Sequence, residues 1–174
     1  MTSGPVLILV GAPGAGKSTV GTAVADRLRV PFADTDDDVA AAAGVPLSEV
    51  VVEAGEAQFR VWERDAVLGR LREFDGGVLA VGGGALAEDE VRAALAGRPV
   101  VWLRVTPANA ASRVGLNAVR PVALGNIRAQ FAAQLKARAP LYEEVARHIV
   151  DTDFLPVPEV VEAVVALTDE GGAA

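Results

Sequence analysis

The sequence predicts an α/β fold in which helices cover both faces of a parallel sheet. The main observation is that short apolar runs alternate with segments of helical periodicity, as in strands that are joined by crossover helices. The second is a glycine-rich loop after the first apolar run, at the kind of edge where such sheets bind ligands. The length of 174 residues suits one domain, so we expect residues 1–174 to fold as a unit.

Five short apolar runs are predicted to be the strands. The first has no basic residue before it and leads directly into the glycine-rich loop, so we interpret it as a buried strand and not as a signal peptide. No run reaches the roughly 18 uncharged apolar residues that a membrane span needs, so we expect no membrane segment. The predicted strands are residues 5–10, 32–34, 78–81, 99–105 and 148–151.

The segments between these runs are predicted to be helices. In the first of them, Val20, Val24 and Leu28 recur at four-residue spacing, which places them on one face. Pro140 should break or kink the seventh helix. Residues 115–125 have no clear periodicity and are predicted to form a loop. The predicted helices are residues 17–29, 37–43, 47–54, 57–73, 88–96, 107–114, 127–147 and 158–167.

The composition excludes several classes of site. The chain has no cysteine, which rules out disulfides and thiolate metal sites and fits a cytoplasmic enzyme. A single histidine, His148, rules out a zinc site built from several histidines. The net charge of −7, from 16 basic and 23 acidic residues, is unlike that of a protein that binds nucleic acid. Only Lys17 and Lys136 are lysines, so the position of each is informative.

Residues 11–18 fit the phosphate-loop pattern G-x-x-x-x-G-K-[ST]. The glycines allow successive backbone N–H groups to point at one anion, and the following helix adds its positive N-terminal end. Lys17 can reach the outer phosphates, and Ser18 offers a hydroxyl oxygen to Mg²⁺. An ordinary glycine-rich turn is the alternative, but the strand before the loop and the amphipathic helix after it favour a phosphate site. We therefore expect residues 11–19 to bind ATP with Mg²⁺.

An acidic segment follows the second predicted strand, where Asp34 and Asp36 are separated by one threonine. One carboxylate could hold a water on Mg²⁺, and the other could orient or deprotonate a hydroxyl acceptor. The segment also precedes a helix, and capping of that helix would explain the same residues. These residues alone leave both alternatives open.

Arginines and glycines are further candidates for an acceptor site. Arg60 and Glu63 share one face of a predicted helix, and a paired arginine can present its fork to a carboxylate. A surface ion pair of little energetic value is the favoured alternative for this pair considered alone. Residues 82–84 are three glycines that either let a ligand approach the backbone or form a flexible turn. Arg120, in a candidate lid, and Arg138 are individually weak candidates.

Taken together, these motifs resemble the shikimate kinase family, whose members are small phosphate-loop kinases of the nucleoside-monophosphate-kinase type. The resemblance covers residues 6–165 and rests on the order and spacing of the motifs. In chain order they are GAPGAGKST, DTD, GEAQFRVWE, GGG, a lid with RP, and RAPLYEEVA. The resemblance implies a three-layer P-loop NTPase fold with a five-stranded parallel sheet in the order 2-3-1-4-5 and a mobile lid at about residues 113–125.

The resemblance also implies which residues handle ATP and its metal. Lys17 would contact the transferred phosphate, and Arg120 would close with the lid and stabilise phosphate charge. Ser18 would bind Mg²⁺, and Asp34 would support the metal through water. Arg113 would lie against the adenine. The implied nucleotide-binding residues are Gly14, Ala15, Gly16, Lys17, Ser18, Thr19, Arg113 and Arg120.

The resemblance implies that shikimate is the phosphate acceptor and that it binds to helices at about residues 36–73. Asp36 would bind ring hydroxyls and orient the 3-hydroxyl for attack, which also makes it a catalytic residue with Lys17 and Arg120. Arg60 and Arg138 would clamp the shikimate carboxylate. The glycines that would bind another ring hydroxyl through the backbone are Gly82, Gly83 and Gly84.

The implied activity is transfer of the γ-phosphate of ATP to shikimate, which gives shikimate 3-phosphate and ADP in aromatic amino-acid biosynthesis. The resemblance further implies a cytoplasmic monomer that binds neither nucleic acid nor a membrane. Four features depart from the usual family residues, but none removes an essential chemical group. Ala80 stands in place of a serine or threonine, Val51 in place of a phenylalanine and Ala40 in place of a glutamate, and the lid has Val-Ala after Arg120-Pro121 in place of Leu-Leu.

Two other functions remain as alternatives. Another small-molecule kinase of the same fold, such as gluconate kinase, has no reason to carry Arg60 and Glu63 on one face together with Arg138. A regulatory module that binds nucleotide without phosphotransfer would need no acceptor arginines at all.

Overall fold

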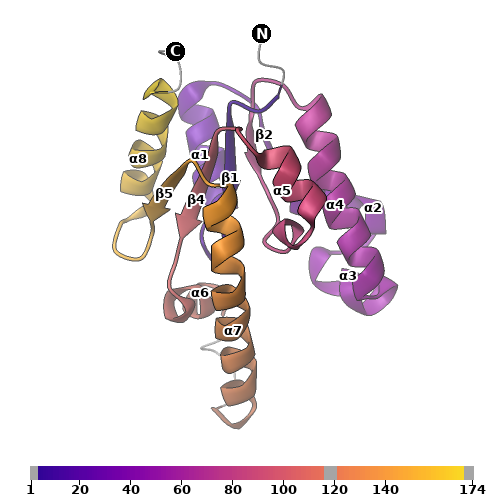
Figure 1. The fold of residues 1–174 in the computed structure, drawn as a ribbon. Helices are drawn as coiled ribbons and strands as arrows, with labels where there is room; N and C mark the ends of the chain where they lie inside the picture. The colour runs from indigo at the N-terminus through magenta and orange to yellow at the C-terminus, as the bar shows by residue number, and fades with distance from the viewer. Residues whose placement is uncertain (1–3, 116–120, 171–174) are drawn as a thin grey trace.

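The computed structural model describes residues 4–115 and 121–170. In these residues, a five-stranded sheet is wholly parallel and has the order β2-β3-β1-β4-β5 (Figure 1). The predicted α/β class and strand order are therefore confirmed. The strands are β1 (Leu7–Val10), β2 (Phe32–Asp34), β3 (Val78–Ala80), β4 (Val100–Arg104) and β5 (His148–Asp151).

Helices lie on both faces of this sheet and complete the three layers (Figure 1). One face packs against α1 and α8, and the other packs against α4, α5 and the C-terminal end of α7. Within the described part of the chain, no helix combines the length and the apolar character that crossing a bilayer requires. The helices are α1 (Lys17–Leu28), α2 (Thr35–Ala43), α3 (Leu47–Ala54), α4 (Glu56–Glu73), α5 (Asp89–Leu95), α6 (Pro107–Arg113), α7 (Pro121–Val145) and α8 (Val157–Glu170), with the 3₁₀ helix η1 (Ala85–Ala87).

The side chains of β1 alternate between two buried clusters, one on each face of the sheet. Leu7 and Leu9 belong to the cluster with α1 and α8, whereas Ile8 and Val10 belong to the cluster with α4 and α5. Each of these four residues is 2% exposed or less. Because helices cover both faces, the strand has a continuous apolar sequence instead of alternating polar and apolar residues.

Parallel pairing aligns the carboxyl ends of three strands at one edge of the sheet. Leu9 pairs with Ala80, and Ala80 pairs with Asp34. The phosphate loop, the glycine run and the acidic segment each begin at or just after this row. A hydrogen bond from the Gly82 N–H to Thr35 Oγ1, at 2.9 Å, joins the last two. The register therefore brings together three motifs that are far apart in sequence, at the edge where such sheets bind ligands.

Helix α7 corrects two of the predictions. The sequence predicts a loop through residue 125, but α7 begins at Pro121, a residue suited to the first turn because its missing N–H would have no helical partner there. The sequence also predicts a break or kink at Pro140, but α7 continues past it to Val145 without a break. Proline removes one helical hydrogen bond, and burial of Leu135 and Tyr142 on either side holds the helix against the body of the protein.

We predict that Val24→Ala lowers the free energy of unfolding by about 2 kcal/mol. Val24 is 0% exposed on α1, so the loss of two methyl groups leaves a cavity against the sheet. Val52→Ala is the matched control, because Val52 is 84% exposed on α3 and its truncation should change stability by at most about 0.5 kcal/mol. Urea unfolding followed by circular dichroism measures both values. Equal losses in the two variants would contradict the position of Val24 in the core.

Candidate active site

The loop between β1 and α1 depends on glycine for its shape. Gly14 and Gly16 have φ angles of 83° and 92°, in the left-handed region that other residues rarely adopt. A Cβ atom on Gly14 would also lie 2.8 Å from the carbonyl oxygen of Ala110. Gly16 is the N-cap of α1 and has no side chain that could accept from the first-turn N–H groups. These donors therefore remain available to an anion.

Lys17 is the first residue of α1 and its side chain turns back into the loop. The residue is 9% exposed, and Nζ donates to the carbonyl oxygens of Gly11 at 2.8 Å and Ala12 at 3.1 Å. Burial lowers the pKa of Lys17, while the nearby carboxylates of Asp36 and Asp34 oppose this effect. The ammonium group therefore lies between the loop and two acidic side chains, where it can contact an outer phosphate.

Ser18 and Asp34 meet beside this loop. Ser18 Oγ donates to Asp34 Oδ2 at 2.5 Å, and Asp34 Oδ1 accepts from the Asp36 N–H at 3.0 Å. Asp34 therefore caps α2, as one of the two alternatives from the sequence has it, and contacts Ser18 at the same time; its role toward Mg²⁺ stays a prediction. A hydroxyl and a carboxylate oxygen are suitable ligands for Mg²⁺, which usually takes few protein oxygens when it is bound together with phosphates. These two residues fit that arrangement.

Asp36, in the first turn of α2, has an unusual electrostatic environment. Burial raises the pKa of Asp36 to about 6; Asp34 and Glu63 contribute to the rise, and Lys17 opposes it. A Cβ atom on Gly82 would lie 2.5 Å from Asp36 Oδ1, so the carboxylate lies directly against the glycine run. A carboxylate that titrates near neutral pH at a binding edge is suited to accept a hydrogen bond or a proton from a hydroxyl.

Arg60 pairs on α4 with Glu63; the glutamate is buried and the arginine half-buried. Arg60 NH1 donates to Glu63 Oε2 at 2.6 Å, and the Glu63 side chain is only 5% exposed. Burial raises the pKa of Glu63, and the charge of Arg60 opposes that rise. The alternative of a surface ion pair is therefore wrong. A Cβ atom on Gly84 would lie 2.0 Å from Arg60 NH1, so the third glycine is needed for this pair to approach the backbone.

Arg138 reaches the same site from α7. Its positive charge adds to the lowering of the Lys17 pKa by burial and opposes the rise of the Glu63 pKa by burial, so the guanidinium lies within electrostatic range of the phosphate loop and of the α4 pair. The structure thus brings Arg138 close to the residues predicted for an acceptor site. Arg120 lies outside the described residues, so its predicted role stays a prediction.

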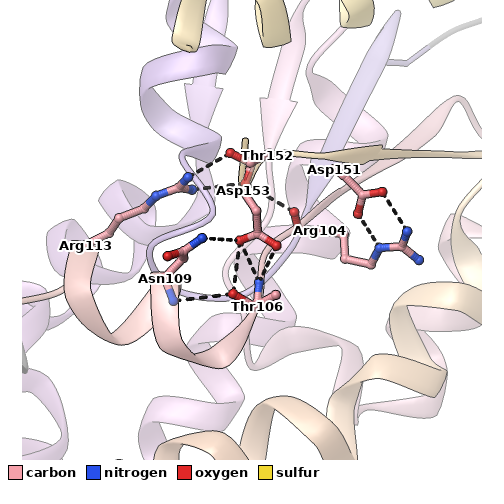
Figure 2. A network of polar contacts seen from close by, with 7 residues as sticks. All are labelled: Arg104, Thr106, Asn109, Arg113, Asp151, Thr152 and Asp153. Atoms are coloured by element: carbon pink, nitrogen blue, oxygen red, sulfur yellow. Dashed lines mark hydrogen bonds and ion pairs between the residues drawn. The ribbon is translucent and has the colours of Figure 1, made fainter. Parts of the chain in front are cut away.

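Arg113 is held by the segment that follows β5 (Figure 2). Its NH1 donates to Thr152 Oγ1 at 3.0 Å and to the Gly14 carbonyl oxygen at 3.2 Å, and NH2 donates to the Thr152 carbonyl oxygen at 2.8 Å. Asp153 accepts from the Thr106 N–H at 3.0 Å and so fixes the start of α6, the helix that carries Arg113. Two adjacent residues after β5 therefore hold this arginine beside the phosphate loop.

A cavity of about 440 Å³ lies between the phosphate loop, Arg113 and the start of α8. Its size and its mixed apolar and polar lining suit a flat heterocycle next to the phosphate site. The lining includes Gly14, Thr19, Val20, Arg113, Thr152 and Pro156.

Two residues of this region escaped the sequence analysis as functional candidates. Thr152 follows the end of a strand, as the acidic segment and the glycine run do, and that position could have identified it. Tyr142 lies within the RAPLYEEVA motif, but only the fold shows that its hydroxyl donates to the Gly83 carbonyl oxygen at 2.9 Å. A tyrosine on a helix is by itself no sign of a binding site.

Comparison with known proteins is consistent with this geometry. A family model described as shikimate kinase matches residues 13–168. The shikimate kinase of Thermobifida fusca is 45% identical over 94% of this chain and 95% of its own length, and that of Saccharopolyspora erythraea is 48% identical over 92% of each.

The fold of this chain also matches solved structures. The structure of shikimate kinase from Acinetobacter baumannii in complex with shikimate has a TM-score of 0.84 and 29% identity, and the match covers 98% of this chain and 96% of that one. A gluconokinase from Sinorhizobium meliloti matches with a TM-score of 0.56 and 20% identity, which shows a shared fold alone. From the family match and the curated relatives, this chain belongs to the shikimate kinase family.

Proposed function

We propose that this protein transfers the γ-phosphate of ATP to the 3-hydroxyl of shikimate and so forms shikimate 3-phosphate and ADP. The observation that carries the proposal is the half-buried Arg60 paired with the buried Glu63, which lies against Gly84 and within range of the charge of Arg138. A half-buried arginine that a carboxylate holds in place beside a second cation is suited to a small carboxylate acceptor. Neither a gluconate kinase nor a regulatory nucleotide-binding module has an evident need for this pair.

On the nucleotide side, residues 14–19 would bind the phosphates through backbone N–H groups. Lys17 would exchange its bonds to the loop carbonyls for the transferred phosphate, where its charge stabilises the transition state. Arg113, held by Thr152, would lie against the adenine in the cavity beside the loop. Ser18 and Asp34 would hold Mg²⁺, directly and through water; the bound ion would neutralise charge on the transferring phosphate.

On the acceptor side, phosphoryl transfer asks the protein mainly for position and charge. Arg60 and Arg138 would hold the carboxylate, and backbone groups of Gly82, Gly83 and Gly84 would contact a ring hydroxyl. Asp36 would accept a hydrogen bond from the 3-hydroxyl and direct its oxygen toward the phosphate. Its raised pKa of about 6 would let it take the proton near neutral pH.

Several finer features stay predictions from the sequence. They are the lid at about residues 113–125 with Arg120 as its phosphate contact, the acceptor-binding helices at about residues 36–73, the single domain over residues 1–174, the monomeric state and the cytoplasmic location.

The reaction is tested by measuring ADP release from ATP and Mg²⁺ with shikimate, with gluconate and with a nucleoside monophosphate. We expect release that depends on shikimate, because only this acceptor has the carboxylate and ring hydroxyls that match the site. Release with another acceptor alone would overturn the assignment of Arg60 and Arg138. Nucleotide binding without release for any acceptor would favour a regulatory module.

We predict that Arg60→Lys raises the KM for shikimate at least about 10-fold and leaves the KM for ATP within about 2-fold. Lysine keeps the charge beside Glu63 but lacks the planar fork that meets a carboxylate with two hydrogen bonds. Arg64→Lys is the matched control on the same helix, since Arg64 pairs with the exposed Asp65. Steady-state kinetics on both variants provides the measurement, and equal KM values for shikimate would contradict the carboxylate clamp.

We predict that Asp36→Asn makes the metal-free protein more stable at pH 7.5 while shikimate turnover falls at least about 100-fold. The pKa of Asp36 is raised from 3.8 to about 6 in the folded chain, so its ionised form destabilises the fold. The gain from asparagine should be complete above about pH 6 and should disappear below about pH 4, where aspartic acid is protonated in both states. Thermal unfolding in EDTA across this range measures it; a gain that does not vary with pH would contradict the electrostatic cause.

A further inference from the structure

A chain of contacts through Tyr142 and the glycine run lies between the two arginines of the acceptor site. Tyr142 lies one turn after Arg138 on α7 and is 2% exposed. Its O–H donates to the Gly83 carbonyl oxygen at 2.9 Å, and the positive charge of Arg138 acts on the phenol and opposes the rise in its pKa. One hydroxyl within range of Arg138 therefore anchors α7 to the backbone of the glycine run.

The chain continues through the peptide group between Gly83 and Gly84. The Gly83 carbonyl and the Gly84 N–H belong to one planar unit, so neither can turn without the other. Gly84 lies directly against the α4 pair, because a Cβ atom there would be 2.0 Å from Arg60 NH1 and 2.9 Å from Glu63 Oε2, and Oε2 accepts from Arg60 NH1 at 2.6 Å. The Tyr142 hydroxyl and the Arg60–Glu63 pair thus contact the two ends of one peptide plane.

Packing restricts the movement of the phenol ring itself. The ring of Tyr142 stacks on Trp102 of β4, with centroids 5.5 Å apart and planes 28° apart. Trp102 is 8% exposed, so both rings belong to the core. Burial raises the pKa of Tyr142 to about 12, and the charge of Arg138 opposes this rise. The hydroxyl is therefore protonated at neutral pH and able to donate.

We propose that Tyr142 is a positioning residue that sets the separation of Arg60 and Arg138 for a small carboxylate acceptor by fixing the Gly83–Gly84 peptide between them. The inference rests on the proposed function, in which shikimate supplies that carboxylate. A clamp made of two long side chains binds well only if their positions are fixed before the acceptor arrives. Tyr142 acts through its neighbours and needs no contact with the acceptor.

The test is Tyr142→Phe, which keeps the stacked ring and removes only the hydroxyl. Losing the donor to the Gly83 carbonyl oxygen leaves that carbonyl oxygen without its partner and should raise the KM for shikimate about 5- to 20-fold. The KM for ATP should stay within about 2-fold, because the phosphate loop keeps its own contacts. An unchanged KM for shikimate, or equal changes in both KM values, would overturn the proposal.

Val145→Ala controls for a purely structural effect. Val145 lies on the same helix, is 7% exposed and packs in the same cluster as Tyr142, but it has no polar side-chain atom. This variant should lower the unfolding temperature without changing the KM for shikimate. A rise in that KM similar to the rise in Tyr142→Phe would show that loss of packing is the cause and would overturn the positioning role.

A double-mutant cycle tests whether Tyr142 acts through the clamp. In an Arg60→Lys background, Tyr142→Phe should raise the KM for shikimate less than about 2-fold, because the clamp is already impaired. If the two single increases in the KM for shikimate multiply in the double variant, the residues act independently, and this result would contradict the connection between Tyr142 and Arg60. Wild-type enzyme that turns over shikimate while the cycle fails would overturn this inference and leave the proposed function intact. Wild-type enzyme without such turnover would overturn both.

A spectroscopic readout covers the case in which the variant does not fold. Tyr142 is the only tyrosine of the chain, so protein labelled with ¹³C at the phenol carbon gives one tyrosine signal. Saturation of the wild-type protein with shikimate should shift this signal, because the hydroxyl bonds the Gly83 carbonyl oxygen and lies within electrostatic range of Arg138. An unmoved signal at saturation, with binding confirmed by calorimetry, would overturn the proposal.

Discussion

The register of three parallel strands is the constraint on which the rest of the site depends. Leu9, Ala80 and Asp34 lie in one row across β1, β3 and β2. Because parallel strands end at the same edge, the segments that follow this row must share a small space. A shift of one strand by one residue would turn its next side chains to the opposite face and separate the acidic segment from the phosphate loop.

Within that space, buried and half-buried charges form opposing sets. Lys17, Arg60 and Arg138 face Asp34, Asp36 and Glu63, and the pKa values of Lys17, Asp36 and Glu63 are shifted by burial in the direction of the neutral form. Burial makes each charge costly, while the opposite charges nearby keep that cost tolerable. Incoming phosphates and a carboxylate would take over part of this compensation, which gives the site a physical reason to bind anions.

The glycines carry a second constraint, because the site needs backbone where other proteins would have side chains. A Cβ atom at Gly82 or Gly84 would collide with Asp36 or Arg60. Two of the residues that depart from the usual family residues lie outside these glycine contacts. Ala80 is 0% exposed within β3, and Val51 is 45% exposed on α3.

The sequence by itself determined the fold class, the strand order through its family resemblance, and the phosphate loop, because these follow from local periodicity and from residues adjacent in the chain. It left the Arg60–Glu63 pair and Asp34 ambiguous, since burial decides whether an ion pair is a weak surface contact or part of a site. It also misplaced the start of α7 and expected a break or kink at Pro140, because tertiary packing outweighs a local preference. Only the tertiary structure decided the contacts of Thr152 and Tyr142, whose partners are 39 and 59 residues away along the chain. Their hydrogen bonds exist because the sheet brings those partners together, and nothing in the local sequence specifies that meeting.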